Sequence, residues 1–298
     1  MSKKVILENE LVKAEICTLG AELYSLIRKS DSREYIWNGD GKYWGRHAPV
    51  LFPFVGSVKD KKYTYSGKEY QMGQHGFARD MEFEVLSEAY DEVKLVLLSN
   101  EDTKARYPFD WELYITYRLK GCSLLTEWKV VNTDDKTLYF SIGGHPAFLC
   151  PKDDKGRVSL DNGAMLYFND LKELKYKLIN ENGQVKDTEI HTRKLEGGFL
   201  KLSNEMFDKD ALIVEDGSVR SVEICNAARK AELTIEFHAP LFGIWSPAGK
   251  KAPFLCIEPW YGRADGEDFN GTLEERKFGN LLQAGAAFTG GYSITLER

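Results

Sequence analysis

The sequence has few cysteines and places them far apart. Its five cysteines are never closer than 28 residues, and no two of them form a C-x-x-C pair. This spacing excludes a zinc ribbon and a thioredoxin motif. We expect reduced thiols and a cytoplasmic protein, because several cysteines sit in apolar runs and the N-terminal segment is too charged for a signal peptide.

Long apolar runs and an excess of one charge are also missing. The longest uncharged stretch, residues 278–296, contains four glycines and several polar residues, so it cannot be a membrane span. The net charge is −6, from 40 basic and 46 acidic residues of alternating sign. Nucleic acids and anionic membranes both demand a basic patch, so we expect neither as a partner.

Motifs that bind nucleotides or metals are absent as well. The sequence contains no G-x-x-x-x-G-K-[ST], no G-x-S-x-G, no H-E-x-x-H and no H-x-H. A metal site would therefore need ligands scattered along the chain. We expect no cofactor and no metal.

The dominant pattern is short β-type runs separated by turn signals. Residues 11–17 alternate apolar and charged side chains, and residues 63–65 and 68–70 flank a Ser-Gly turn, which predicts a hairpin. With the runs that follow, the sequence has more than a dozen such runs at roughly hairpin spacing. They include residues 81–86, 93–98, 111–119, 123–131, 137–142, 211–214, 219–225, 231–237, 254–257 and 292–296.

Helical signals are few and short, for example residues 170–177 and 272–277. Strands without alternating helices exclude a doubly wound α/β fold and a TIM barrel. We therefore predict an all-β fold, a large antiparallel β-sandwich that forms a single domain over residues 1–298. Two smaller β domains are the alternative.

Three segments interrupt the strand pattern and set ionisable residues beside glycine, proline and aromatic residues: 44–80, 141–148 and 254–265. Loops of this kind at strand ends can form the floor of a pocket. His145 is either a core histidine bonded to backbone or a general acid. Glu258 ends an apolar run, so it either turns to solvent or is buried with a raised pKa that suits a general base.

Other residues of these segments also have a purely structural interpretation. His75 can be a surface turn histidine, Arg79 can pair with Asp80, and Arg46 can form a structural ion pair. The aromatic residues Phe77, Trp245 and Trp260 can pack in the core or stack on a ligand.

Three short motifs occur in this order: HGFAR at 75–79, GGHPAF at 143–148 and IEPW at 257–260. Together they resemble the motifs of the aldose 1-epimerase (galactose mutarotase-like) superfamily, and most of all those of its LacX-like subgroup. The resemblance covers nearly the whole chain. It implies a β-sandwich of the galactose mutarotase type with an open sugar cleft on one sheet. It also implies cofactor-free interconversion of the α and β anomers of an aldose.

The resemblance implies a role for individual residues. His145 falls on the family's general acid, Glu258 on its general base, and His75 on the histidine that helps bind the ring oxygen. Asp210 matches a hydroxyl-binding aspartate and Trp245 an aromatic residue near the cleft. One departure concerns Ser57, where family members usually carry an arginine, and we expect Arg46 to supply that guanidinium from a neighbouring strand.

Several functions remain open at the level of sequence. Arg46, Arg79 and Arg263 suit a phosphate, so a hexose-6-phosphate 1-epimerase is an alternative to an epimerase of free aldohexoses. A sugar-binding protein without catalysis is a second alternative. A glycosidase, which needs two carboxylates across the scissile bond, is a third. In each case we expect a small sugar as the partner and a monomer or a homodimer.

Overall fold

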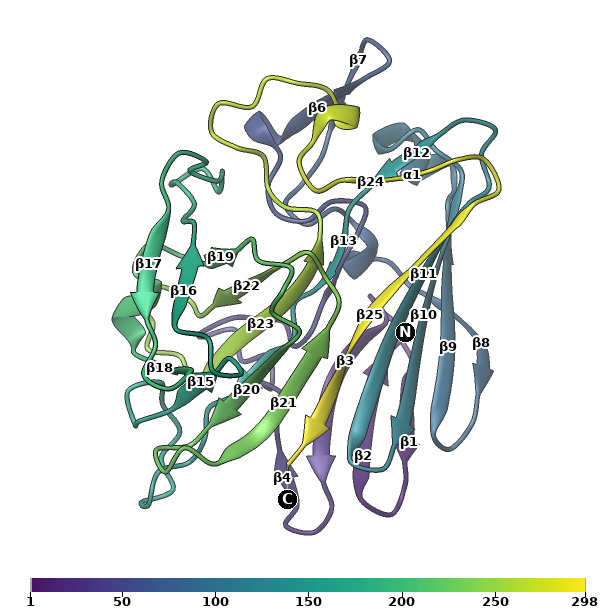
Figure 1. Ribbon diagram of the computed structural model, residues 1–298. Coiled ribbons are helices and arrows are strands. Elements are labelled where there is room, and N and C mark those ends of the chain that lie inside the picture. The colour runs from purple at the N-terminus through teal and green to yellow at the C-terminus, as the bar shows by residue number, and fades with distance from the viewer. Residues whose placement is uncertain (1, 298) are drawn as a thin grey trace.

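The computed structural model describes residues 2–297, and its largest sheet has nine antiparallel strands (Figure 1). In the two ten-residue strands Trp111–Lys120 and Ser123–Asn132, buried residues alternate with more exposed ones, because one face of the sheet packs on a core. In spatial order the strands are β18 (Phe199–Lys201), β15 (Met165–Tyr167), β20 (Ser221–Cys225), β21 (Ala231–Phe237), β25 (Ala287–Leu296), β11 (Ser123–Asn132), β10 (Trp111–Lys120), β9 (Glu92–Leu98) and β8 (Glu84–Glu88).

A second sheet lies against the first. Its strands are β19 (Leu212–Val214), β22 (Leu241–Trp245), β23 (Phe254–Tyr261), β13 (Ile142–Gly144) and β5 (Val50–Leu51), and β14 (Ala147–Leu149) also pairs with β23. Phe237 of β21 and Phe242 of β22 have ring centroids 5.2 Å apart, so the two sheets share a core. This arrangement confirms the predicted antiparallel β-sandwich.

Smaller sheets complete the molecule. The N-terminal sheet consists of β1 (Lys4–Glu8), β2 (Val12–Cys17), β3 (Glu22–Arg28) and β4 (Arg33–Glu34). Three two-stranded sheets pair β6 (Lys62–Tyr65) with β7 (Lys68–Gln71), β12 (Leu138–Phe140) with β24 (Asn280–Leu282), and β16 (Glu173–Tyr176) with β17 (His191–Lys194). The β6–β7 hairpin confirms its prediction: Ser66 and Gly67 both have positive φ, at 49° and 72°, as a two-residue hairpin turn requires.

Helices are few and short, as predicted, and one of the two predicted segments contains a helical turn. The predicted helix at 170–177 is wrong, because β16 occupies this segment, and the prediction at 272–277 reduces to a 3₁₀ turn at Leu273–Glu275. The other helices are α1 (Glu101–Arg106) and 3₁₀ turns at Lys59–Lys61, Ala78–Asp80 and Asn204–Phe207. Among residues 2–297, no helix has the length and apolar character needed to cross a membrane.

The centre of the second sheet is buried on both faces. In β23, Leu255 and Ile257 belong to the main core, whereas Cys256, Glu258 and Trp260 belong to the opposite face. The expectation that Glu258 ends its strand is therefore wrong, because β23 continues to Tyr261. Glu258 instead lies within the strand, on the face that carries the cleft described next.

Candidate active site

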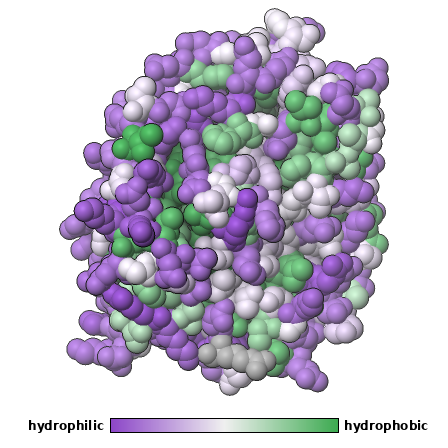
Figure 2. All heavy atoms as spheres, in the orientation of Figure 1, coloured by the Kyte–Doolittle hydropathy of each residue, from purple (hydrophilic) through white to green (hydrophobic). Residues whose placement is uncertain are grey.

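A cleft of about 230 Å³ opens over the second sheet. Figure 2 shows one face of the molecule, on which most side chains are hydrophilic and apolar ones are visible in a recess between them. Eight of the residues singled out from the sequence line this cleft: six come from the three unusual segments, and Asp210 and Trp245 come from outside them. The six are Ser57, His75, Arg79, His145, Glu258 and Trp260.

Strand register places a tryptophan beside Glu258. Trp260 lies two residues further along β23, on the same face, and lines the cleft. Its neighbours on the adjoining strands are glycines: a Cβ on Gly143 would lie 2.6 Å from the indole, and one on Gly243 only 2.5 Å. The two glycines therefore leave the room in which the indole lies flat across the sheet.

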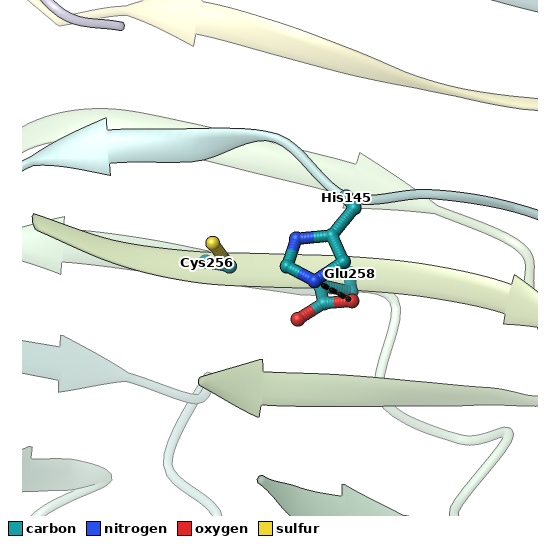
Figure 3. A group of neighbouring side chains, drawn as sticks. All are labelled: His145, Cys256 and Glu258. Carbon is teal, nitrogen blue, oxygen red and sulfur yellow. Dashed lines mark ion pairs between the residues drawn. The ribbon is translucent and has the colours of Figure 1, made fainter. Parts of the chain in front are cut away.

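The central contact of the cleft joins an imidazole and a carboxylate. Nε2 of His145 lies 3.3 Å from Oε2 of Glu258, and the two side chains face each other in Figure 3. His145 follows β13, and its backbone N–H donates to the carbonyl of Pro49. Residue exposure is 7% for His145 and 1% for Glu258, so little water competes for this contact.

Burial shifts the titration of both groups toward their uncharged forms. Desolvation, aided by the nearby Arg79 cation, lowers the pKa of His145 to about 3. Desolvation, aided by the charge of Asp210, raises the pKa of Glu258 well above its usual value. At 3.3 Å the two groups can share one proton, and the buried site favours the neutral pair over the ion pair.

A second histidine is fixed in one tautomer. The backbone N–H of Gly56 donates to Nδ1 of His75 at 3.1 Å, so Nδ1 is an unprotonated acceptor and the proton of the neutral ring lies on Nε2. Burial lowers the pKa of His75 well below its ordinary value, which keeps the ring neutral. With a φ of 65°, His75 also holds a left-handed backbone conformation of the kind that clusters at functional sites. His75 is thus a hydrogen-bond donor in the cleft.

Aromatic side chains surround His145. Trp44 stacks on its ring with centroids 4.7 Å apart, and Trp245 meets it edge-on at 5.4 Å. Asp210 lines the same cleft with a φ of 68°, and burial raises its pKa. Aromatic faces beside hydrogen-bond acceptors suit sugars, whose rings have apolar faces and hydroxyl edges.

The two arginines near the cleft differ in position. Arg79 lines it and donates to the carbonyl of Gln74, and burial, aided by Arg46, lowers the pKa of Arg79 to about 10. Arg46 pairs with Asp80 at 2.7 Å. It lies on the loop between β4 and β5, so the expectation that it reaches the site from a neighbouring strand is wrong. Its role in binding stays a prediction.

Two other side chains singled out from the sequence lie away from the cleft. Arg263 is buried and paired with Asp187 at 2.7 Å and Glu215 at 3.2 Å, which removes it from the arginines open to a phosphate. Phe77 packs in the core, with its ring 6.0 Å from that of Trp111.

Ser57, the position where family members usually carry an arginine, lines the cleft beneath the turn that carries Gly183, where a Cβ would lie 2.7 Å from the serine hydroxyl oxygen. Sequence reasoning missed two other residues that shape the site, Glu22 and Trp44. Glu22 accepts from the backbone N–H groups of His47 and Ala48 and so fixes the loop that carries Trp44. An acidic residue within a strand gives no signal of this role, whereas Trp44 stood in a flagged segment and could have been found.

Fold and site together define a class of protein: large antiparallel β-sandwiches with paired titratable side chains in an open cleft. The family follows from comparison with known proteins. Residues 3–272 match the family model described as Aldose 1-epimerase, so the chain belongs to the aldose 1-epimerase family. It is also 30% identical over 279 residues to the plasmid-encoded protein LacX of Lactococcus lactis subsp. lactis, with 91% of each chain covered.

Solved structures agree with this assignment. A galactose mutarotase related enzyme from Lactobacillus acidophilus superposes with a TM-score of 0.91 at 33% identity, covering 99% of this chain and 98% of that one. A galactose mutarotase-like protein from Lactobacillus casei superposes with a TM-score of 0.90 at 31% identity, covering 99% of this chain and 100% of that one. The β-sandwich is therefore of the galactose mutarotase type, and the family supports an epimerase or mutarotase activity.

Proposed function

We propose that the protein is an aldose 1-epimerase that interconverts the α and β anomers of a free aldohexose without a cofactor. The observation that carries this proposal is the 3.3 Å contact between His145 and Glu258 on the floor of the cleft. Ring opening of a hemiacetal needs one base at the C1 hydroxyl and one acid at the ring oxygen. Both groups stand here side by side in the cleft.

The proton balance of the reaction fits the buried pair. Glu258 as carboxylate takes the proton of the C1 hydroxyl, His145 as imidazolium gives its proton to the ring oxygen, and the bond between C1 and that oxygen breaks. The reactive form is the ion pair, which burial makes the less populated form of the resting site, and the step converts it into the neutral pair. The open aldehyde rotates about C1–C2, and closure on the other face returns both protons.

Other cleft residues hold the sugar in this scheme. His75 donates from Nε2 to the ring oxygen, which its fixed tautomer permits. Asp210 accepts from sugar hydroxyls, and Trp44 and Trp245 pack against the ring. None of them gains or loses a proton in the reaction.

Polarimetry tests this proposal directly. Wild-type protein should accelerate the relaxation of α-D-glucose or α-D-galactose to its equilibrium rotation. Glu258→Gln and His145→Ala should each lose about 10²–10⁴-fold in rate, the usual contribution of a general acid or base. Glu223→Gln and His191→Ala are matched controls on β20 and β17, outside the cleft lining, and should keep the wild-type rate.

The outcomes separate the proposal from its alternatives. Full activity in either cleft variant would overturn the assignment of that residue. Tight sugar binding without acceleration would favour a binding protein, and release of nitrophenol from a nitrophenyl glycoside would favour a glycosidase with Asp210 as the second carboxylate.

One observation favours a second candidate, a hexose-6-phosphate 1-epimerase. Arg79 lines the cleft, and among residues 2–297 its buried Nε has no hydrogen-bond partner, so it could bind an anionic substituent. Faster turnover of glucose 6-phosphate than of glucose, lost in Arg79→Gln, would establish this variant of the activity. If Arg79→Gln lowered the turnover of glucose and of glucose 6-phosphate by the same factor, Arg79 would contact the sugar ring and not a phosphate.

A further inference from the structure

A cysteine stands beside the imidazole–carboxylate pair. Cys256 precedes Glu258 by two residues in β23, so both side chains lie on the same face of the strand. Figure 3 shows the thiol, the imidazole and the carboxylate next to one another. One donor atom from each of His145, Cys256 and Glu258 lies within 4.8 Å of the other two. All three are buried, Cys256 completely.

The structure leaves a buried donor atom of this cluster without a hydrogen bond. Among residues 2–297, Oε2 of Glu258 is buried and has no hydrogen-bond partner, although Nε2 of His145 stands 3.3 Å away. Buried polar atoms without a partner are rare in native structures and call for an explanation. The thiol of Cys256 has no part in the proton transfers. In the same described residues, no other three such side chains come this close together.

We propose that His145, Cys256 and Glu258 bind a thiophilic divalent cation of the Zn²⁺ class. Zinc is held by thiolate sulfur at about 2.3 Å and by nitrogen and oxygen at about 2.0–2.2 Å. Tetrahedral geometry then separates donor atoms by roughly 3.3–3.6 Å. The imidazole and the carboxylate already stand 3.3 Å apart, so the thiol needs to move by little more than about 1 Å.

Charge and access agree with this site. A thiolate and a carboxylate carry two negative charges, which neutralise a divalent cation in a buried place; binding releases the thiol proton and the shared proton to solvent. The three side chains leave the fourth coordination position free, as in open zinc sites. The ion reaches them through the cleft, which His145 and Glu258 line.

Metal binding and sugar turnover exclude each other at this site. The cation takes up lone pairs of His145 and Glu258, the same groups that move protons in the proposed reaction. A thiophilic metal therefore inhibits the enzyme reversibly, and a chelator restores it. This consequence rests on the proposed function, whereas the metal site itself does not.

The test is direct binding to the full chain, freed of metal with a chelator. Cadmium titrated into wild-type protein should give the thiolate-to-metal absorbance in the near ultraviolet, saturating at one ion per chain. Cys256→Ser should lose this absorbance. Calorimetric titration with Zn²⁺ should show affinity reduced at least about tenfold, since even loss of an outer-shell partner costs about 10–100-fold.

Cys150→Ser is the matched control, because Cys150 is also buried but outside the cluster. It should bind both metals like wild type. If circular dichroism shows that Cys256→Ser is unfolded, His145→Ala replaces it in the test. That variant keeps the thiol but removes another ligand, so its affinity for Zn²⁺ should fall by a similar factor.

Three results would overturn the proposal. They are no absorbance in wild type, unchanged absorbance in Cys256→Ser, and equal Zn²⁺ affinity in all variants, which would mean adventitious surface binding. None of these results depends on sugar turnover. A protein that binds cadmium through Cys256 but does not accelerate mutarotation would keep the metal site and refute the proposed function.

Discussion

The indole of Trp260 owes its place to the absence of two side chains. Gly143 and Gly243 flank β23 on either side, and any Cβ there would meet the ring at 2.6 Å or less. Contacts this short force the ring or the strand to move. The position of Trp260, and with it the floor beside Glu258, therefore depends on two residues that touch no substrate.

Gly243→Ala tests this dependence. We expect a loss of about 1–3 kcal/mol in the free energy of unfolding, the usual cost of overpacking, measured by urea denaturation. We also expect slower mutarotation by polarimetry, because the displaced indole shifts the cleft floor. Gly217→Ala is the control, since its Cβ would meet Pro240 at an ordinary 3.5 Å. Equal stability and activity in both variants would refute this account of Trp260.

Single residues of the site could be predicted where a motif carried them. His75, His145 and Glu258 stood in three recognisable motifs, and the structure brings all three into one cleft. Glu22 could not be found this way, because its contribution is to accept two backbone N–H groups from a loop 25 residues away. Such a role depends on tertiary contacts and leaves no trace in local sequence.

At the scale of elements, the helix predicted at residues 170–177 is wrong because this segment fits both the helical and the strand spacing of apolar residues. Leu171, Leu174 and Leu178 follow helical spacing, whereas Leu174, Tyr176 and Leu178 alternate with charged residues as in a strand. The structure buries Leu174 and Tyr176 on one face of β16, so the strand period prevails. Pairing with β17, which no local pattern reveals, decides between the two.

An ion cluster links the chain after β16 to the chain after β23. Asp187 is bonded to Arg263 at 2.7 Å, to Lys277 at 3.0 Å and to Lys177 at 3.1 Å. Burial opposes ionisation of this carboxyl, but the three cations outweigh it and lower its pKa from 3.8 to about 2. The cluster thereby fixes the segment that carries Ile179 and Gly183 over the cleft.

Asp187 makes stability depend on acid. Its pKa is lower in the folded than in the unfolded chain, so its contribution is complete above about pH 4 and is lost as pH falls toward 2. The lost contribution is about 2 kcal/mol, which urea unfolding between these pH values measures. The Asp187→Asn variant should have a lower free energy of unfolding than wild type at neutral pH. Between about pH 4 and pH 2 its free energy of unfolding should change less than that of wild type. The control Asp154→Asn, at an exposed residue, should show the same pH dependence of stability as wild type. If the free energy of unfolding of Asp187→Asn fell with pH as steeply as that of wild type, the prediction would be wrong.

At the scale of the whole molecule, one core cluster includes side chains from Val5 to Leu296 and from both large sheets. Differential scanning calorimetry should therefore show a single transition whose calorimetric and van't Hoff enthalpies agree, as for a single domain over residues 1–298. Two resolved transitions would favour two smaller domains instead. The overall architecture was predictable because hairpin spacing repeats along the sequence, whereas the order of strands within each sheet rests on long-range pairing.

The position of β25 has a consequence for how the protein is made. This strand, Ala287–Leu296, lies between β21 and β11 and joins the two halves of the nine-stranded sheet. During translation, both halves leave the ribosome before the strand that connects them exists. The edges of the two halves stay unpaired until residue 296 has emerged. During this interval the nascent chain is most prone to aggregation and most dependent on a chaperone.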